Sequence, residues 1–151
     1  MNFKQRVANQ ELKGRDKAIN LFGAKIELTE STNRYDSWDL SGSTVGIIGT
    51  KESNFFIELK DRDYASDDFK SDFLELSKFH NLLDVEPNAN HYYLCFFTDG
   101  VYRLYKLDGL KLQDVDIKTS LFPSDMDKTY LVEKLAVFLP TKIAIKQGKI
   151  N

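Results

Sequence analysis

Two short stretches of the chain, residues 35–40 and 55–60, carry the residue types best suited to chemistry. Residues two apart in a strand point to the same face, so Glu58 and Lys60 are expected to project together from the second stretch. The first stretch adds aspartate. Carboxylates beside an ammonium group suit metal-assisted attack of water on a phosphodiester.

The carboxylates of these stretches indicate a site for a hard cation, Mg²⁺ or Mn²⁺. Such a cation would be coordinated by carboxylates, a backbone carbonyl, substrate phosphate and water. Asp39, Glu58 and the carbonyl of Leu59 could supply the protein ligands, and Lys60 would orient the attacking water and stabilise negative charge. Asp36 and Asp39 have opposite parity in a regular strand, so one of them is expected to face the site. Asp39 is preferred because small residues follow it closely, and Asp36 stays open as a ligand or as a turn cap.

The Glu-x-Lys pattern is short, and the chain contains a second copy at Glu11 and Lys13. A structural alternative for Glu58 and Lys60 is therefore an ion pair where the strand leaves the core. The position of Glu58 and Lys60 at the end of an apolar strand favours a functional site over this ion pair, because a charge there needs compensation. Glu11 is a candidate outer or second-metal ligand if its helix packs near the strand end, and otherwise a surface glutamate.

Arg62 and Lys78 are candidates for holding substrate phosphate, with a surface ion pair for Arg62 and a solvated side chain for Lys78 as the alternatives. His80 and His91 lack partners at zinc spacing. Cys95 is the single cysteine, which excludes an intrachain disulfide and indicates a buried small side chain.

The composition indicates a folded protein, with 42% hydrophobic residues and no run of about 18 apolar residues that could span a membrane. No secretory signal is evident, so a cytoplasmic location is expected. The net charge of −2 argues against a simple nucleic-acid binder, although a metal-site enzyme carries its own carboxylates. Basic residues after Glu133 are expected to form a solvated tail.

Hydrophobic periodicity predicts one α/β domain spanning residues 1–151, least certain in residues 108–151, with a mixed β-sheet flanked by helices. The strand that ends in Glu-x-Lys is apolar on both faces, which is typical of a central strand. For residues 131–139 a strand is slightly favoured over a helix, and residues 108–124 are expected to be mainly loop. The other expected elements are helices at 3–22 and 66–83, and strands at 24–30, 35–40, 45–48, 54–60, 91–97 and 101–107.

These residues resemble the PD-(D/E)XK nuclease superfamily over about residues 3–83. The match consists of a helix with Glu11, a strand with an aspartate, a strand ending Glu58-Leu59-Lys60, and a following helix. The proline of the eponymous motif is absent, since Ser37-Trp38 precedes Asp39. The resemblance implies a restriction-endonuclease-like core and Mg²⁺-dependent hydrolysis of phosphodiesters, usually in DNA. It also implies that Asp39 and Glu58 bind metal and that Lys60 is the catalytic lysine.

Three functions follow as hypotheses. The first is a metal-dependent nuclease, for which a homodimer would allow two strands to be cut. The second is a catalytically inactive, nuclease-like interaction module within a larger nucleic-acid-processing, phage or defence complex, which the net charge favours mildly. The third is a small-ligand binder that uses the tyrosine-rich residues 91–107. The sequence leaves open whether the substrate is DNA or RNA and whether cleavage is that of an endonuclease or an exonuclease.

Overall fold

The computed structural model describes residues 3–22, 27–33, 36–44, 53–123 and 130–150. Two α-helices, nine strands and two short 3-10 helices lie within these ranges. Their bounds, in chain order, are α1 Phe3–Phe22, β1 Leu28–Glu30, β2 Leu40–Thr44, β3 Ser53–Asp61, β4 Ser71–Glu75, α2 Leu76–Leu83, β5 Asn90–Phe96, β6 Val101–Lys106, η1 Leu112–Asp114, β7 Asp116–Pro123, β8 Leu131–Pro140, η2 Thr141–Ile143 and β9 Lys146–Lys149.

A six-stranded mixed sheet in the order β1-β2-β3-β5-β6-β9 forms the centre of the fold. Among the described residues β3 and β5 form a parallel pair, and the other neighbouring strands of this sheet pair antiparallel. Parallel neighbours need a long crossover connection, which β4 and α2 provide between β3 and β5. The expected α/β class with a mixed sheet flanked by helices is therefore confirmed.

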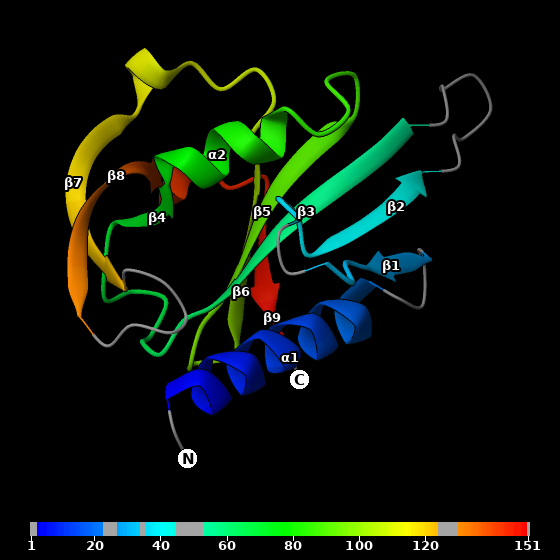
Figure 1. Cartoon of the computed structure of the whole chain (residues 1–151), viewed down its shortest axis with the longest axis horizontal. Helices are drawn as coiled ribbons and strands as arrows, with labels where there is room; N and C mark the ends of the chain where they lie inside the picture. Colours follow the sequence, from blue (N-terminus) through cyan, green and yellow to red (C-terminus); the bar gives the residue numbers. More distant parts are fainter. Residues whose placement is uncertain (1–2, 23–26, 34–35, 45–52, 124–129, 151) are drawn as a thin grey trace.

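The central sheet is covered on both faces (Figure 1). Phe55, Ile57 and Leu59 of β3 pack in one apolar cluster with Ala18 of α1. Phe56 points to the opposite face, in a second cluster that includes side chains of α2, β4 and β8. This alternation places even-numbered residues of β3 on the face shared with α2 and the second sheet.

Several expected elements are confirmed. The helix over 3–22 has the expected bounds, and the strand over 54–60 is β3, which the sheet buries on both faces. The hairpin of β5 and β6 turns at Gly100, whose φ of 78° lies in the left-handed region that glycine adopts without strain. The strand favoured over 131–139 is β8.

The strand expected over 35–40 is wrong for residues 36–39, because β2 begins at Leu40. The start of this segment bonds within a loop, and at its end Asp39 bonds to the neighbouring segments. The N–H of Asp36 donates to Asn33 and that of Ser31 donates to the Asp39 carbonyl. The small residues expected to follow the end of a strand instead form the interior of β2.

The helix expected over 66–83 is wrong in its first part. Residues 71–75 form β4, and α2 begins only at Leu76. The apolar spacing of this segment fits either element, and tertiary contacts decide. Asp72 is buried and accepts hydrogen bonds from Arg103 and from Tyr105 on the neighbouring sheet.

A second, three-stranded sheet in the order β4-β8-β7 goes beyond the sequence-based expectation. Residues 116–123, expected to be loop, form β7 and pair with β8. Part of the expected solvated tail is also a strand, since β9 pairs with β6.

The expected strand at 45–48 lies outside the described residues, as does part of the one at 24–30, of which Leu28–Glu30 is β1. No helix of the described part of the chain is long and apolar enough to cross a membrane.

Candidate functional site

Glu58 and Lys60 lie near the end of β3, on the sheet face shared with α2 and the second sheet. Glu58 is only 9% exposed, whereas Lys60 is exposed. A carboxylate at this depth needs a compensating partner, which the Lys78 amine supplies at 3.0 Å. Both residues line a pocket of about 160 Å³ whose opposite wall comes from β4, β7 and α2.

Asp39 lies one residue before β2, beside this part of β3. Its backbone N–H donates to the Ile57 carbonyl at 2.8 Å. Its Oδ2 atom accepts the backbone N–H of Leu59, also at 2.8 Å. The Oδ1 atom lies 3.4 Å from Nη2 of Arg15, a helix α1 residue that sequence reasoning missed. The carboxylate is therefore held in place by the backbone of β3 and by α1.

The Leu59 carbonyl is well placed to join Asp39 as an oxygen donor. The N–H and C=O of one strand residue point toward the same side. Since the N–H of Leu59 points to Asp39, its carbonyl faces that side too, beyond the last residue of the β2 ladder. Two carboxylates and one carbonyl are ligands that Mg²⁺ or Mn²⁺ accepts.

Glu58 is in an environment that disfavours its charge. Burial raises the pKa of its carboxyl from 4.5 to about 7, and the nearby Asp39 carboxylate adds to this increase. Lys78 acts in the opposite direction, because its Nζ atom lies 3.0 Å from Oε1 of Glu58. A cation between the two carboxylates would relieve the same repulsion more strongly.

Lys60 has a lowered pKa, for reasons that come from the protein around it. Desolvation is the main cause, and the positive charges of Lys78 and Arg62 add to it. The charges of Glu58 and Glu11 partly oppose the decrease. An amine with a lowered pKa beside two carboxylates is a pattern that favours a functional site over an ordinary surface ion pair.

Lys78 is exposed, as the solvated alternative expects, but it has an ion-pair partner, whereas Arg62 departs from the surface position expected of it. Lys78 pairs with Glu58 across the pocket, and this contact raises the pKa of its amine. Arg62 is buried, and its Nη2 atom donates to the Phe73 carbonyl and to the Tyr93 hydroxyl. The alternative of a surface ion pair for Arg62 is therefore wrong.

Two other candidates lie apart from the pair of carboxylates. Asp36 is exposed, and its Oδ2 accepts the Ser31 hydroxyl at 2.6 Å, as a loop-stabilising residue does. Glu11 is exposed on α1 and acts on the site through its effect on Lys60. Within the described ranges, no group of three or more His, Cys, Asp or Glu side chains is arranged to hold a metal ion. The candidate oxygen donors that remain are Asp39, Glu58 and the Leu59 carbonyl.

Comparisons with known proteins support the fold. No protein-family model matches the chain, and no curated protein matches it. A solved structure of Hjc from Archaeoglobus fulgidus, a Holliday junction resolvase from an archaeal hyperthermophile, is similar over 91% of this chain and 92% of its own, with a TM-score of 0.53 and 13% sequence identity. At 13% identity this similarity shows a shared fold, so the expected α/β core with a mixed sheet flanked by helices is confirmed at the level of the fold.

Proposed function

We propose that this chain is a metal-dependent nuclease that hydrolyses phosphodiester bonds of DNA. The observation that supports this most strongly is that Glu58 and Lys60 line one pocket of a nuclease-like fold, while the Asp39 carboxylate binds the backbone N–H of Leu59 between them and acts on the charge of Glu58. A buried carboxyl group whose pKa is raised to about 7 beside an amine with a lowered pKa is a combination that occurs often at functional sites.

Each residue has a distinct role in this proposal. Asp39, Glu58 and the Leu59 carbonyl would hold Mg²⁺ or Mn²⁺, which lowers the pKa of a bound water and stabilises charge on the phosphate. Lys60 would orient the attacking water and donate to the developing negative charge. Lys78 neutralises Glu58 when no cation is bound. Once a cation takes over this role, Lys78 would be free to contact a phosphate oxygen.

DNA is the proposed substrate because one similar solved structure is that of a Holliday junction resolvase. A four-way junction is therefore the first substrate to compare with duplex and single-stranded DNA, and RNA is a further comparison. Cleavage of two strands of a junction would call for two copies of the site, which motivates a homodimer as part of this proposal.

The test is a cleavage assay with Mg²⁺, Mn²⁺ or EDTA, using the native chain, Lys60→Ala and Lys106→Ala. Lys106 is an exposed lysine of β6 and serves as a matched control. We expect metal-dependent cleavage by the native chain and by the control, and a loss of at least about 100-fold in Lys60→Ala. Folded native protein without metal-dependent cleavage of any substrate would overturn the proposal.

A second candidate is a catalytically inactive interaction module on the same scaffold. The Glu58–Lys78 ion pair favours it, because a lysine bound to a prospective metal ligand can replace the metal as its counter-charge. Calorimetric titration with Mn²⁺ separates the two. An inactive module should show no binding that depends on Asp39, whereas the nuclease should bind Mn²⁺ and lose this binding in Asp39→Asn.

A further inference from the structure

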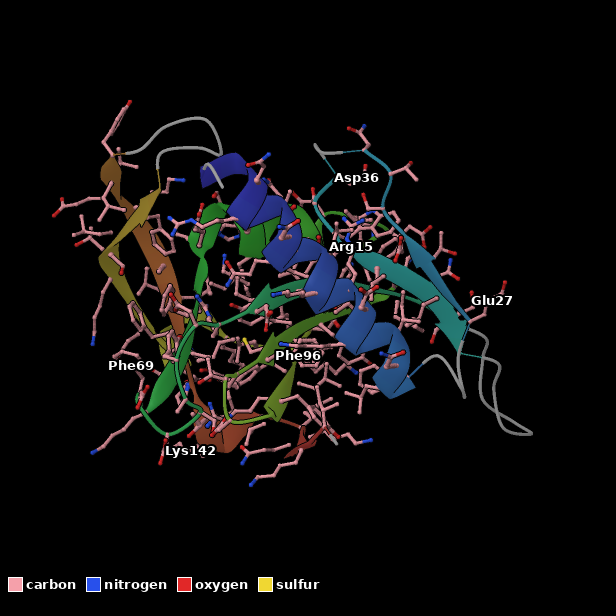
Figure 2. The ribbon with its side chains drawn as sticks, turned by 90° about the horizontal axis from the view of Figure 1, so that it is seen from below. Arg15, Glu27, Asp36, Phe69, Phe96 and Lys142 are labelled. Atoms are coloured by element: carbon pink, nitrogen blue, oxygen red, sulfur yellow. The ribbon has the colours of Figure 1, made fainter. Side chains whose placement is uncertain are left out.

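A second hollow, of about 440 Å³, lies between α1 and the end of β3. We call it the α1 groove. Its α1 wall carries Arg6, Lys13 and Lys17, and its other wall includes Asp61 and Asp63. Figure 2 shows α1 crossing the sheet on the side that faces the viewer, so this wall is on the surface of the molecule. None of these α1 residues belongs to the candidate metal site.

The polar residues of the α1 groove form one stripe along the helix. Arg6, Gln10, Lys13 and Lys17 follow at intervals of four, three and four residues, which places them on one helix face. Lys17 and Gln10 fix the helix to the strand end, through the Asp61 carboxylate at 2.7 Å and the Asp61 carbonyl at 2.6 Å. These contacts keep the stripe at a fixed position beside β3.

Arg6 and Lys13 differ from Lys17 because they are exposed and have no ion-pair partner among the residues that the structure describes. Their charge is part of a wider asymmetry. Residues 3–22 contain five basic and two acidic side chains, a net charge of +3 in a chain whose net charge is −2. A basic helix on an acidic chain, with Arg6 and Lys13 exposed along one of its faces, is an electrostatic feature that favours a polyanion site.

The α1 groove and the candidate site share one lining residue at the end of β3. Arg62 lines both the α1 groove and the pocket that contains Glu58 and Lys60. Glu11, on the same helix, is close enough for its charge to act on Lys60. Both hollows therefore lie near the same end of β3, where Lys60 is.

We propose that the α1 groove binds the phosphate backbone of the DNA strand that extends from the candidate cleavage site, with Arg6 and Lys13 as the main contacts. This rests on the proposed function for the identity of the polyanion. From Arg6 to Lys17 the helix rises about 16 Å, which matches the axial length of four or five nucleotides at about 3.4 Å each. The groove would set the direction and register of the strand and leave the sequence unread.

The test measures DNA binding without catalysis, by fluorescence anisotropy in EDTA with a labelled single strand, duplex and four-way junction. The groove variant carries Arg6→Glu and Lys13→Glu. The control carries Lys111→Glu and Lys142→Glu, which change the net charge equally at two exposed positions off α1. Lys142 lies apart from α1 in Figure 2. All four substitutions are at exposed positions, and circular dichroism checks that both variants fold.

We expect the groove variant to bind at least 10-fold more weakly than the control. We also expect a plot of log binding constant against log salt concentration that is shallower by about 0.7 to 0.9 for each phosphate that the variant no longer neutralises. Equal weakening in both variants would overturn the proposal, as would a native chain that binds none of the three DNA molecules at low salt.

The two proposals can fail separately. Groove-dependent binding without metal-dependent cleavage would leave the α1 groove as a binding surface and reject the nuclease. Cleavage by the native chain together with equal DNA binding by the groove variant and the control would keep the nuclease and reject the α1 groove.

Discussion

The Asp39 carboxylate accepts a hydrogen bond from the backbone N–H of Leu59 at 2.8 Å. Leu59 lies between Glu58 and Lys60 on β3. This contact joins two segments that are twenty residues apart in sequence. It gives Asp39 a structural role in addition to the proposed metal-binding role, because it satisfies a backbone donor beyond the end of the β2 ladder. Substitutions at Asp39 can separate the two roles.

Asp39→Asn should abolish metal-dependent cleavage while leaving the fold nearly as stable. The asparagine amide oxygen can still accept from Leu59, but the charge that would hold the cation is gone. Asp39→Ala should abolish cleavage and also lower the free energy of unfolding by about 1–3 kcal/mol, because the Leu59 N–H loses its partner. Urea unfolding of both variants, beside the cleavage assay, tests this. Equal stability of the two variants would show that the hydrogen bond has no structural role.

Glu58→Gln should stabilise the metal-free protein at pH 8 and have little effect on it at pH 4. The folded-state pKa of about 7 lies above the ordinary value of 4.5, so the protonated form is favoured in the fold. Stability from this group is therefore fully present below about pH 4.5 and is lost as pH rises through about 7. The pKa difference corresponds to at most roughly 3 kcal/mol. Thermal unfolding in EDTA at both pH values checks the sign, and a stabilisation that is the same at both would contradict it.

Lys78→Ala should change how metal binding depends on pH. Lys78 lowers the pKa of Glu58, so without it Glu58 takes up protons at a higher pH. At pH 6.5 the variant should bind Mn²⁺ more weakly than the native chain, since the cation must displace a proton. At pH 9 it should bind more tightly, since the cation no longer competes with an ammonium group 3.0 Å from Glu58. Calorimetric titration at the two pH values would reveal such a crossover. A change in Mn²⁺ affinity of the same sign at both pH values would show that Lys78 does not act through the protonation of Glu58.

The sequence allowed α1, β3 and the β5–β6 hairpin to be predicted because their signals are local: helical spacing, a continuous apolar run and an Asp-Gly turn. It also placed Glu58 and Lys60 on one face, which needs only strand parity. The strand-to-helix boundary before Leu76 could not be predicted locally, because β4 forms by pairing with β8 more than sixty residues later.

The candidate site could be predicted only in part, for a related reason. Arg15 reaches Asp39 from α1, and Lys78 reaches Glu58 from α2. Both contacts depend on how helices pack on the sheet, which residue spacing does not reveal. The Glu11 that the resemblance singled out acts on Lys60 electrostatically but does not form a three-carboxylate cluster within the described residues.

Gly42→Ala should destabilise the fold and weaken the site together. A Cβ atom at this position in β2 would lie 2.5 Å from the Phe55 ring and 2.8 Å from the Glu27 carbonyl oxygen, so one strand must shift. Overpacking of this kind costs about 1–3 kcal/mol. Because β2 continues directly from Asp39, the shift should also misplace the carboxylate relative to Leu59. Ser43→Ala, on the exposed side of the same strand, is the control. Urea unfolding and Mn²⁺ titration of both variants test the coupling, which would be disproved by a destabilised Gly42→Ala protein that still binds Mn²⁺ with native affinity.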